Sequence, residues 1–375
     1  MPLSLYLLAV AVFAMGTSEF MLAGLLPDLA ADLGVPPGTA GLLTSAFAIG
    51  LVIGAPLMAA LARRWPRRAS LCGFLVVFLA AHVAGAVTGS FALLFATRVL
   101  AALANAGFLA VALTTAADVG RKGRAVAVLL AGTTLATVAG VPGGALLGAA
   151  SGWRATFWAV ALLCLPALAA VLLVPAGEAA RGDLRRELAQ LRRPRLLVVL
   201  LLGALVNAAT FGSFTFLALL ADGAAVPVVL VLFGLGSFAG VTVAGRLSDD
   251  RPGVVLGAGG LLLLGGWLAL AAFPGAVFAL AFTQGALSFG VGGTLIALAL
   301  HEAAGAPTMA GSYATAALNV GAAAGPALAA AALGVDERGP AWVSAALVAV
   351  FLVITRGRAP RGSASRASGD RPARE

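Results

Sequence analysis

The sequence predicts an all-α membrane protein whose twelve transmembrane helices form two pseudo-symmetric bundles of six. Three observations lead to this prediction: the composition, twelve separate apolar runs, and the placement of the positive charges. Of the 375 residues, 61% are hydrophobic and 10% are charged, whereas soluble domains carry roughly 25% charged residues. This balance excludes a soluble domain, and the abundance of apolar residues excludes a disordered chain.

Twelve apolar runs approach the length of about 20 residues that a helix needs to cross a bilayer. The first six lie at 3–26, 39–61, 71–88, 91–117, 125–149 and 154–174. Six more lie at 196–221, 227–247, 253–273, 276–300, 309–333 and 341–355. The first run is too long for a cleaved signal segment and contains Glu19.

The polar stretch between the two sets of runs predicts four parts of the chain. They are an N-terminal six-helix bundle (1–174), a cytoplasmic central loop (175–195), a C-terminal six-helix bundle (196–355) and a disordered cytoplasmic tail (356–375). The tail is rich in Arg, Ser, Gly and Pro, which is typical of disorder.

Positive charge divides unequally between the two sides of the predicted spans. With the N-terminus in the cytoplasm, 21 of the 24 Lys and Arg residues fall in cytoplasmic segments. Arg154 and Arg338 fall outside, and Arg98 remains inside a span. Because cytoplasmic loops carry such an excess, we expect a multi-pass protein of the inner (plasma) membrane with both termini cytoplasmic. The net charge of +9 therefore indicates topology and contact with membrane lipid, and not binding to nucleic acid.

An internal repeat becomes visible when the chain is shifted by 186 residues. Gly50 and Gly54 then fall on Gly236 and Gly240, and Arg98 falls on Gln284. The fifth span needs a slightly different offset of 184, so the match is partial. Two facing bundles of this kind place a substrate site between them, near the middle of the membrane.

Two charged residues lie deep in the predicted spans. Glu19 precedes the outer end of the first span by about seven residues, and Arg98 follows the outer start of the fourth by about seven, which places both roughly 10 Å below the surface. Charge inside hydrocarbon is costly and usually functional or paired. The pair is therefore a candidate for proton coupling, in which Glu19 gains and loses a proton under the influence of Arg98. A purely structural ion pair between two helices is the alternative.

Uncharged polar and aromatic residues in the spans are candidates for holding a neutral ligand. His82 lies at a depth similar to that of Glu19 and is a further candidate for the polar cluster. The candidate ligand-binding residues are Asn105, Asn207, Phe211, Phe214, Gln284 and Asn319. Each amide has interhelical hydrogen bonding as an alternative role, and the phenylalanines could instead face lipid.

The Gly-rich stretches are not phosphate-binding loops, because they lie inside apolar runs. Gly140, Pro142, Gly143 and Gly144 predict a kinked fifth helix, in which the proline frees a carbonyl and the glycines let a neighbour pack closely. No nucleotide-binding, nucleophile or zinc sequence is present. Two cysteines and two histidines build no disulfide framework or metal site. We therefore expect no enzyme, no cofactor and no metal.

Several of these segments together resemble the drug:proton antiporters of the major facilitator superfamily, which have twelve helices. The stretch 139–144 (AGVPGG) resembles the fifth-helix antiporter motif, and 98–107 (RVLAALANAG) resembles the fourth-helix motif with its proton-coupling Arg. The stretch 16–28 resembles the first-helix motif of sugar-efflux and chloramphenicol-resistance exporters. Longer runs at 101–115, 203–211 and 302–323 are similar to actinomycete chloramphenicol-resistance exporters.

One loop departs from the family pattern. The loop after the second helix usually carries an Asp in the motif G-x-L-x-D-R-x-G-R-R. Aligning Arg67 and Arg68 with the final two arginines places Arg63 at the Asp position. Asp249 is the surviving acid in the matching loop of the second half, so the resemblance assigns these residues to a modified cytoplasmic latch. The short loop 222–226 is a second departure.

The resemblance implies a monomeric, proton-coupled exporter of a small neutral drug, with chloramphenicol or a related phenicol as the leading substrate. The two halves would expose the site alternately to either side. An exporter of sugars or another endogenous metabolite, and a broader multidrug exporter, are the alternatives within the family. A membrane sensor and a membrane enzyme are the alternatives from other classes, and no motif favours either.

Overall fold

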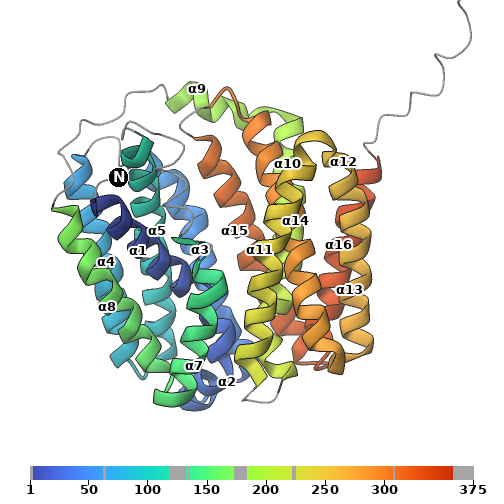
Figure 1. The fold of residues 1–375 in the computed structure, drawn as a ribbon, viewed down its shortest axis with the longest axis horizontal. Coiled ribbons are helices and arrows are strands. Elements are labelled where there is room, and N and C mark those ends of the chain that lie inside the picture. Colours follow the sequence, from blue (N-terminus) through green and yellow to red (C-terminus); the bar gives the residue numbers. More distant parts are fainter. Residues whose placement is uncertain are drawn as a thin grey trace, which may run out of the picture.

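The computed structural model describes residues 3–61, 65–117, 132, 133, 135–172, 184–221, 225–306 and 309–357, and Figure 1 shows them as parallel and antiparallel helices. No strand occurs among these residues. The helix α9 lies at one end of the molecule and α2 and α7 lie at the opposite end (Figure 1), so we call these the α9 end and the α2 end.

The helices that precede residue 172 form what we call the first helix group. Their bounds are α1 (Leu3–Phe20), α2 (Leu22–Leu33), α3 (Pro37–Leu61), α4 (Arg67–Val87), α5 (Phe91–Ala117), the π-turn η2 (Ala136–Gly140), α7 (Val141–Ser151) and α8 (Trp153–Val171).

The helices from residue 184 onward form the second helix group. Their bounds are α9 (Leu184–Leu188), η3 (Ala189–Arg192), α10 (Pro194–Thr215), η4 (Leu217–Leu220), α11 (Val226–Asp250), α12 (Pro252–Val254), the π-turn η6 (Val255–Gly259), α13 (Gly260–Ala272), η7 (Pro274–Ala276), α14 (Val277–Glu302), α15 (Ala310–Leu333) and α16 (Gly339–Gly357).

Within the described residues, nine helices are long and apolar enough to cross a membrane, and ten if the bent pair α1–α2 counts as one span. Two further apolar helices, Ala136–Ser151 and Trp153–Ala169, are shorter. The predicted multi-pass helical architecture is therefore confirmed, while the count of twelve stays a prediction.

The two groups have largely separate hydrophobic cores. One core is built almost entirely from α1–α8, and the other mainly from α10–α16. The groups meet along α3 and α15, and where α11 packs on η2 and α7. At the second of these contacts Gly234 lies against the Thr137 carbonyl, where an added Cβ would have no room.

The glycine pairs of the internal repeat occupy equivalent contacts in the two groups. Gly50 and Gly54 bring α3 against the backbone of α5, at Val99 and Leu103. Gly236 and Gly240 bring α11 against the backbone of α14 in the same manner, at the Phe282 and Ala286 carbonyls. Small residues allow such close approach between spanning helices.

The first span differs from the predicted range 3–26. α1 ends at Phe20, α2 continues the chain through Pro27 to Leu33, and the two helices meet at an angle of 53°. Pro27 lacks the backbone N–H that would bond the Ala23 carbonyl, which weakens the helix near the break. Gly34 ends α2 in the left-handed conformation, with a φ of 63°.

A polar clamp holds the α2 end of the first group together. Trp153 Nε1 donates to Asp32 Oδ2 over 3.1 Å, and Arg154 forms a salt bridge with the same carboxylate. Arg154 also donates to the Thr88 carbonyl over 3.0 Å, which links α2, α4 and α8. The Asp32 carboxylate therefore accepts from two side chains of α8 at once.

The central loop contains a short helix that docks on the second group. Glu187 of α9 is 6% exposed, and its carboxylate accepts from the backbone N–H of Met309, ahead of α15, over 2.9 Å. Residues 175–183 of the predicted loop, residues 358–375 of the predicted tail, and Arg63 lie outside the described residues, as do 222–224 of the short loop.

Candidate functional site

The break between α1 and α2 places two polar residues in the last turn of α1. Ser18 is fully buried, while Glu19 is partly exposed. Met21 interrupts the helix at a point where the Leu22 N–H would otherwise bond the Ser18 carbonyl. Irregular backbone at membrane depth needs another partner, because hydrocarbon offers none.

Arg98 of α5 supplies that partner. Its Nη2 donates to the Ser18 carbonyl over 2.7 Å, and its Nη1 donates to Ser18 Oγ over 2.8 Å. The guanidinium carbon lies 4.3 Å from the centre of the Phe47 ring, a cation–π contact that a buried charge favours. Arg98 is 1% exposed, so its charge is held at the broken end of α1 by two hydrogen bonds and one ring.

His82 of α4 completes this cluster from the other side of Ser18. His82 Nδ1 lies 2.8 Å from the Phe78 carbonyl, and Nε2 lies 2.7 Å from Ser18 Oγ. A carbonyl only accepts, so Nδ1 carries the proton, and in the neutral ring Nε2 then accepts from the Ser18 hydroxyl. The hydrogen bonds therefore run in one direction, from Arg98 through Ser18 and His82 to Phe78.

Glu19 lies beside this network and is not bonded into it. The charge of Arg98 acts on the Glu19 carboxylate through space, while the guanidinium N–H groups are directed to Ser18. The structure thus brings together the predicted residues Glu19 and Arg98, with His82 as the third member. Glu19 is partly exposed as a residue, and the hydrogen bonds of the Ser18 bridge do not involve its carboxylate.

The candidate amides do not converge on one point. Asn207 Nδ2 donates to the Leu318 carbonyl over 2.7 Å and joins α10 to α15. Asn319 Nδ2 donates within its own helix to the Thr315 carbonyl over 2.9 Å. Gln284 Nε2 donates to the Leu263 carbonyl of α13 over 3.1 Å, while its Oε1 is buried without a hydrogen-bond partner among the described residues. Asn105 of α5 is 7% exposed.

The candidate phenylalanines belong to an aromatic cluster between the two groups. Phe20 of α1 stacks on Phe211 of α10, with 5.6 Å between ring centres. The series continues through Phe214 and Phe233 to Phe289, with centre distances of 6.1, 4.6 and 6.2 Å. The space among these rings is about 10 Å³, roughly one water. A ligand would have to separate the rings in order to bind there.

Ser18, Phe20, Phe233 and Phe289 were not among the predicted site residues. Ser18 is adjacent to Glu19 in the sequence, and this adjacency is the signal that could have identified it as a site residue. Phe233 and Phe289 carry no signal of their own, because the chain has 19 Phe residues in apolar surroundings.

The motif around Pro142 forms a π-turn, η2, that runs directly into α7, so Ala136–Ser151 is one continuous helix, and the predicted kink stays a prediction. A Cβ at Gly140 would overlap Thr17 Oγ1, and one at Gly144 would lie 3.1 Å from Thr156 Cγ2. Gly143 is different: an added Cβ would meet nothing within 4 Å. The prediction of close packing is therefore wrong for Gly143, because its face of α7 is exposed.

The predicted latch residues lie at the α9 end. Arg67 and Arg68 begin α4, and Asp249 lies in the last turn of α11, where only its backbone is described. Elsewhere in the described part of the chain, no three His, Cys, Asp or Glu side chains gather so that they could hold a metal ion.

Comparison with known proteins adds the family context. The model of the Major Facilitator Superfamily matches residues 8–326. The chain is 65% identical to a chloramphenicol resistance protein of Streptomyces lividans, with 94% of this chain and 95% of that protein covered. It is 34% identical to the inner membrane transport protein YdhP of Escherichia coli strain K12, with 92% and 94% covered. The fold is similar to that of a bacterial homologue of the human lysosomal transporter Spinster, crystallised in an inward-facing, unoccupied conformation, with a TM-score of 0.69, 18% identity, and 95% and 94% of the chains covered.

Proposed function

The chain belongs to the Major Facilitator Superfamily and is a transporter rather than an enzyme, and from this premise we propose that it exports a small neutral drug in exchange for protons. Chloramphenicol or a related phenicol is the leading substrate, because the relative that is 65% identical over nearly its whole length is a chloramphenicol resistance protein. An exporter of a sugar or another endogenous metabolite, or a broader multidrug exporter, is the alternative.

In this proposal the chain spans the inner membrane as a monomer with twelve helices in two pseudo-symmetric bundles, 1–174 and 196–355. The α9 end, with the loop 175–195, and both termini face the cytoplasm, since the arginines concentrate there. Segment 356–375 is a disordered cytoplasmic tail. Arg67, Arg68 and Asp249 contribute to closure of the cytoplasmic side.

The observation that carries the proposal is the half-buried Glu19 beside a buried network. Export against a gradient needs an energy source, and a carboxylate that is charged in one state and neutral in the other can supply it. Arg98 is fixed at Ser18, so its field at Glu19 depends on the position of the α1 break. A change in the α1–α2 angle would therefore change how readily Glu19 holds its proton.

The drug would bind between the groups, where the aromatic cluster can open. Phe211 and Phe214 would contact its apolar part, and Asn105, Asn207, Gln284 and Asn319 would offer polar contacts. Asn207 is the best placed of the four, because it is partly exposed while the other three are buried. Gly140, Pro142 and Gly144 would let η2 and α7 shift against their neighbouring helices during the cycle, whereas Gly143 packs against nothing.

The test is drug accumulation in a pump-deficient host that expresses the chain, across phenicols, tetracyclines and cationic dyes. We expect lower cellular chloramphenicol and higher resistance to it, both lost when an uncoupler collapses the proton gradient. Unchanged accumulation of every phenicol would contradict the proposal. Export of sugars without export of phenicols would favour the alternative.

A further inference from the structure

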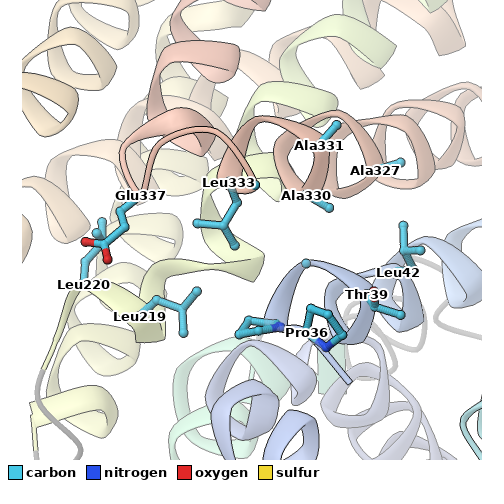
Figure 2. A pocket seen from close by; sticks show the side chains of 13 residues that line it. Pro36, Thr39, Leu42, Leu219, Leu220, Ala327, Ala330, Ala331, Leu333 and Glu337 are labelled. Atoms are coloured by element: carbon cyan, nitrogen blue, oxygen red, sulfur yellow. The ribbon is translucent and has the colours of Figure 1, made fainter. Parts of the chain in front are cut away.

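A cavity of about 710 Å³ opens at the α2 end of the contact between the two helix groups, and Figure 2 shows it from close by. Its lining comes from both groups and is mostly apolar: Thr39 and Leu42 of α3, Leu219 and Leu220 of η4, and Ala330 and Leu333 of α15. In Figure 2 the α15 residues face the α3 residues across the space. We call this cavity the vestibule. Its size lies in the range of small-molecule sites.

Two contacts join the helix groups next to the vestibule. The Phe216 ring, 2% exposed, lies on Gly41 of α3, where an added Cβ would overlap it. One turn further into the molecule, Ser45 Oγ donates to the Ala323 carbonyl of α15 over 2.7 Å. Both contacts join the first group to the second, so they must break when the groups part at this end.

Phe216 also lies between the two compartments along the chain. Phe211 and Phe214 precede it in the aromatic cluster, and Leu219 and Leu220 follow it in the vestibule. Phe216 therefore joins the aromatic cluster to the vestibule along the chain, at the turn between α10 and η4.

The chemistry of the lining defines what the vestibule can hold. Its leucine, alanine and proline surfaces favour a flat apolar body. The Glu337 carboxylate lies at the edge of the space, beside Leu220 (Figure 2), and it only accepts hydrogen bonds when ionised. A ligand with hydroxyl or amide N–H donors fits this edge, and an anion is repelled by it.

We infer that the vestibule is a second binding site for the transported compound, on the release side of a gate formed by Phe216 on Gly41 and Ser45 on Ala323. The ligand class is an uncharged molecule with an apolar ring system and hydrogen-bond donors. This inference rests on the proposed function, because it takes the α2 end to be the outside. It adds a site that is filled from the outer solution while the gate is closed.

The experiment measures protection of single cysteines in intact cells. Thr39→Cys and Leu220→Cys, each in a chain with Cys72→Ser and Cys164→Ser, place a thiol on the vestibule wall. Val335→Cys is the matched control, because Val335 lies near the same end, is 90% exposed and does not line the cavity. A membrane-impermeant maleimide is added from outside, with and without external chloramphenicol, in de-energised cells. The same variants are assayed for export in energised cells.

We expect chloramphenicol to slow labelling at both vestibule positions by about threefold or more, and to leave Val335→Cys unchanged. Export without protection would overturn the vestibule site and leave the proposed function standing. Protection without export would support the site and contradict the proposed function. Loss of both would overturn both, and equal slowing at Val335→Cys would overturn the site by showing an unspecific effect.

A second pair of variants tests the edge of the site. Glu337→Gln, in the Leu220→Cys background, keeps the shape and removes the charge, so half-protection should need about three- to tenfold more chloramphenicol, as expected for one charge-assisted hydrogen bond. Asp336→Asn is the matched control, since Asp336 does not line the vestibule. An equal requirement in both variants would remove Glu337 from the site.

Discussion

Positions related by the 186-residue offset differ in chemistry between the two helix groups. Arg98 corresponds to Gln284, Ser18 to Ala204, and Glu19 to Leu205. In the first group the Arg98 guanidinium donates to the Ser18 hydroxyl, which in turn bonds His82. In the second, a single amide is half-satisfied against Leu263. The same helix frame therefore carries a charged centre in one group and an almost apolar one in the other.

This difference indicates which helix group can bind and release a proton. At the positions that match Glu19 and Arg98 the second group has Leu205 and Gln284, which do not ionise, so proton coupling in our proposal falls to the first group. The binding surface then falls largely to Phe211, Phe214, Phe233 and Phe289 of the second group. Coupling depends on contacts that join the two, such as the Phe20–Phe211 stack.

The largest expected effect comes from joining the two groups covalently. An added Cβ at Gly38 would lie 3.6 Å from Ala330 Cβ, which suits a disulfide. We expect Gly38→Cys with Ala330→Cys to lose all export after mild oxidation and to regain it after reduction. The control is Gly290→Cys with Ala244→Cys, which joins two helices within the second group. An added Cβ at Gly290 would lie 3.2 Å from Ala244 Cβ. Export that survives the first cross-link would show that the groups do not part at the α2 end.

Glu19→Gln should abolish export that depends on a pH gradient and leave drug binding intact. The amide keeps the shape of the side chain and cannot ionise, so the proton cannot be exchanged. Drug uptake into inside-out vesicles under an imposed pH gradient is the measurement. Asp28→Asn, on the exposed face of α2, should retain uptake. Concentrative uptake by Glu19→Gln vesicles would move the coupling site elsewhere, with His82 as the next candidate.

The glycines of the fifth span should differ sharply in how well they tolerate substitution by alanine. Gly140→Ala forces a methyl group into Thr17, and overpacking of this kind costs about 1–3 kcal/mol, so export should fall by about tenfold. Gly143→Ala adds a methyl group in open space and should change export by less than about twofold. The comparison needs equal amounts of both variants in the membrane, measured by immunoblot. Equal export rates would contradict the role of Gly140 at the α1 contact.

The last comparison concerns stability rather than export, where the two polar centres should differ. Ser18→Ala leaves Arg98 Nη1 and His82 Nε2 without their partner, and each loss costs about 1–3 kcal/mol. Gln284→Leu removes one hydrogen bond and one unsatisfied oxygen together, so it should change the free energy of unfolding by less than about 1 kcal/mol. Unfolding by SDS in mixed micelles would measure both, with Ser18→Thr as the variant that restores the hydroxyl. A larger loss for Gln284→Leu would reverse the comparison.

The sequence predicts the helical membrane architecture well, because each spanning helix is a continuous run of apolar residues and can be recognised without knowledge of its neighbours. It also identifies Glu19 and Arg98, since charges in apolar runs are rare and costly. The bridging role of Ser18 could not be predicted, because its partners are 64 and 80 residues away in the sequence. A serine in an apolar helix also costs little free energy, so its presence there is no signal of function. Gly140 and Gly143 could not be told apart because the π-turn rotates the following helix by an extra residue, about 100°.

The two π-turns also bear on how the two halves of the chain have diverged. Each adds a residue to one helix, at Ala136–Gly140 in the first group and Val255–Gly259 in the second. At the repeat offset the first falls on the regular helix α15, and the second falls on the regular helix α4. Neither turn has a counterpart in the other half. If the halves arose by gene duplication, each π-turn was gained in one half or lost from the other after it, so the halves have diverged in helix register as well as in charge.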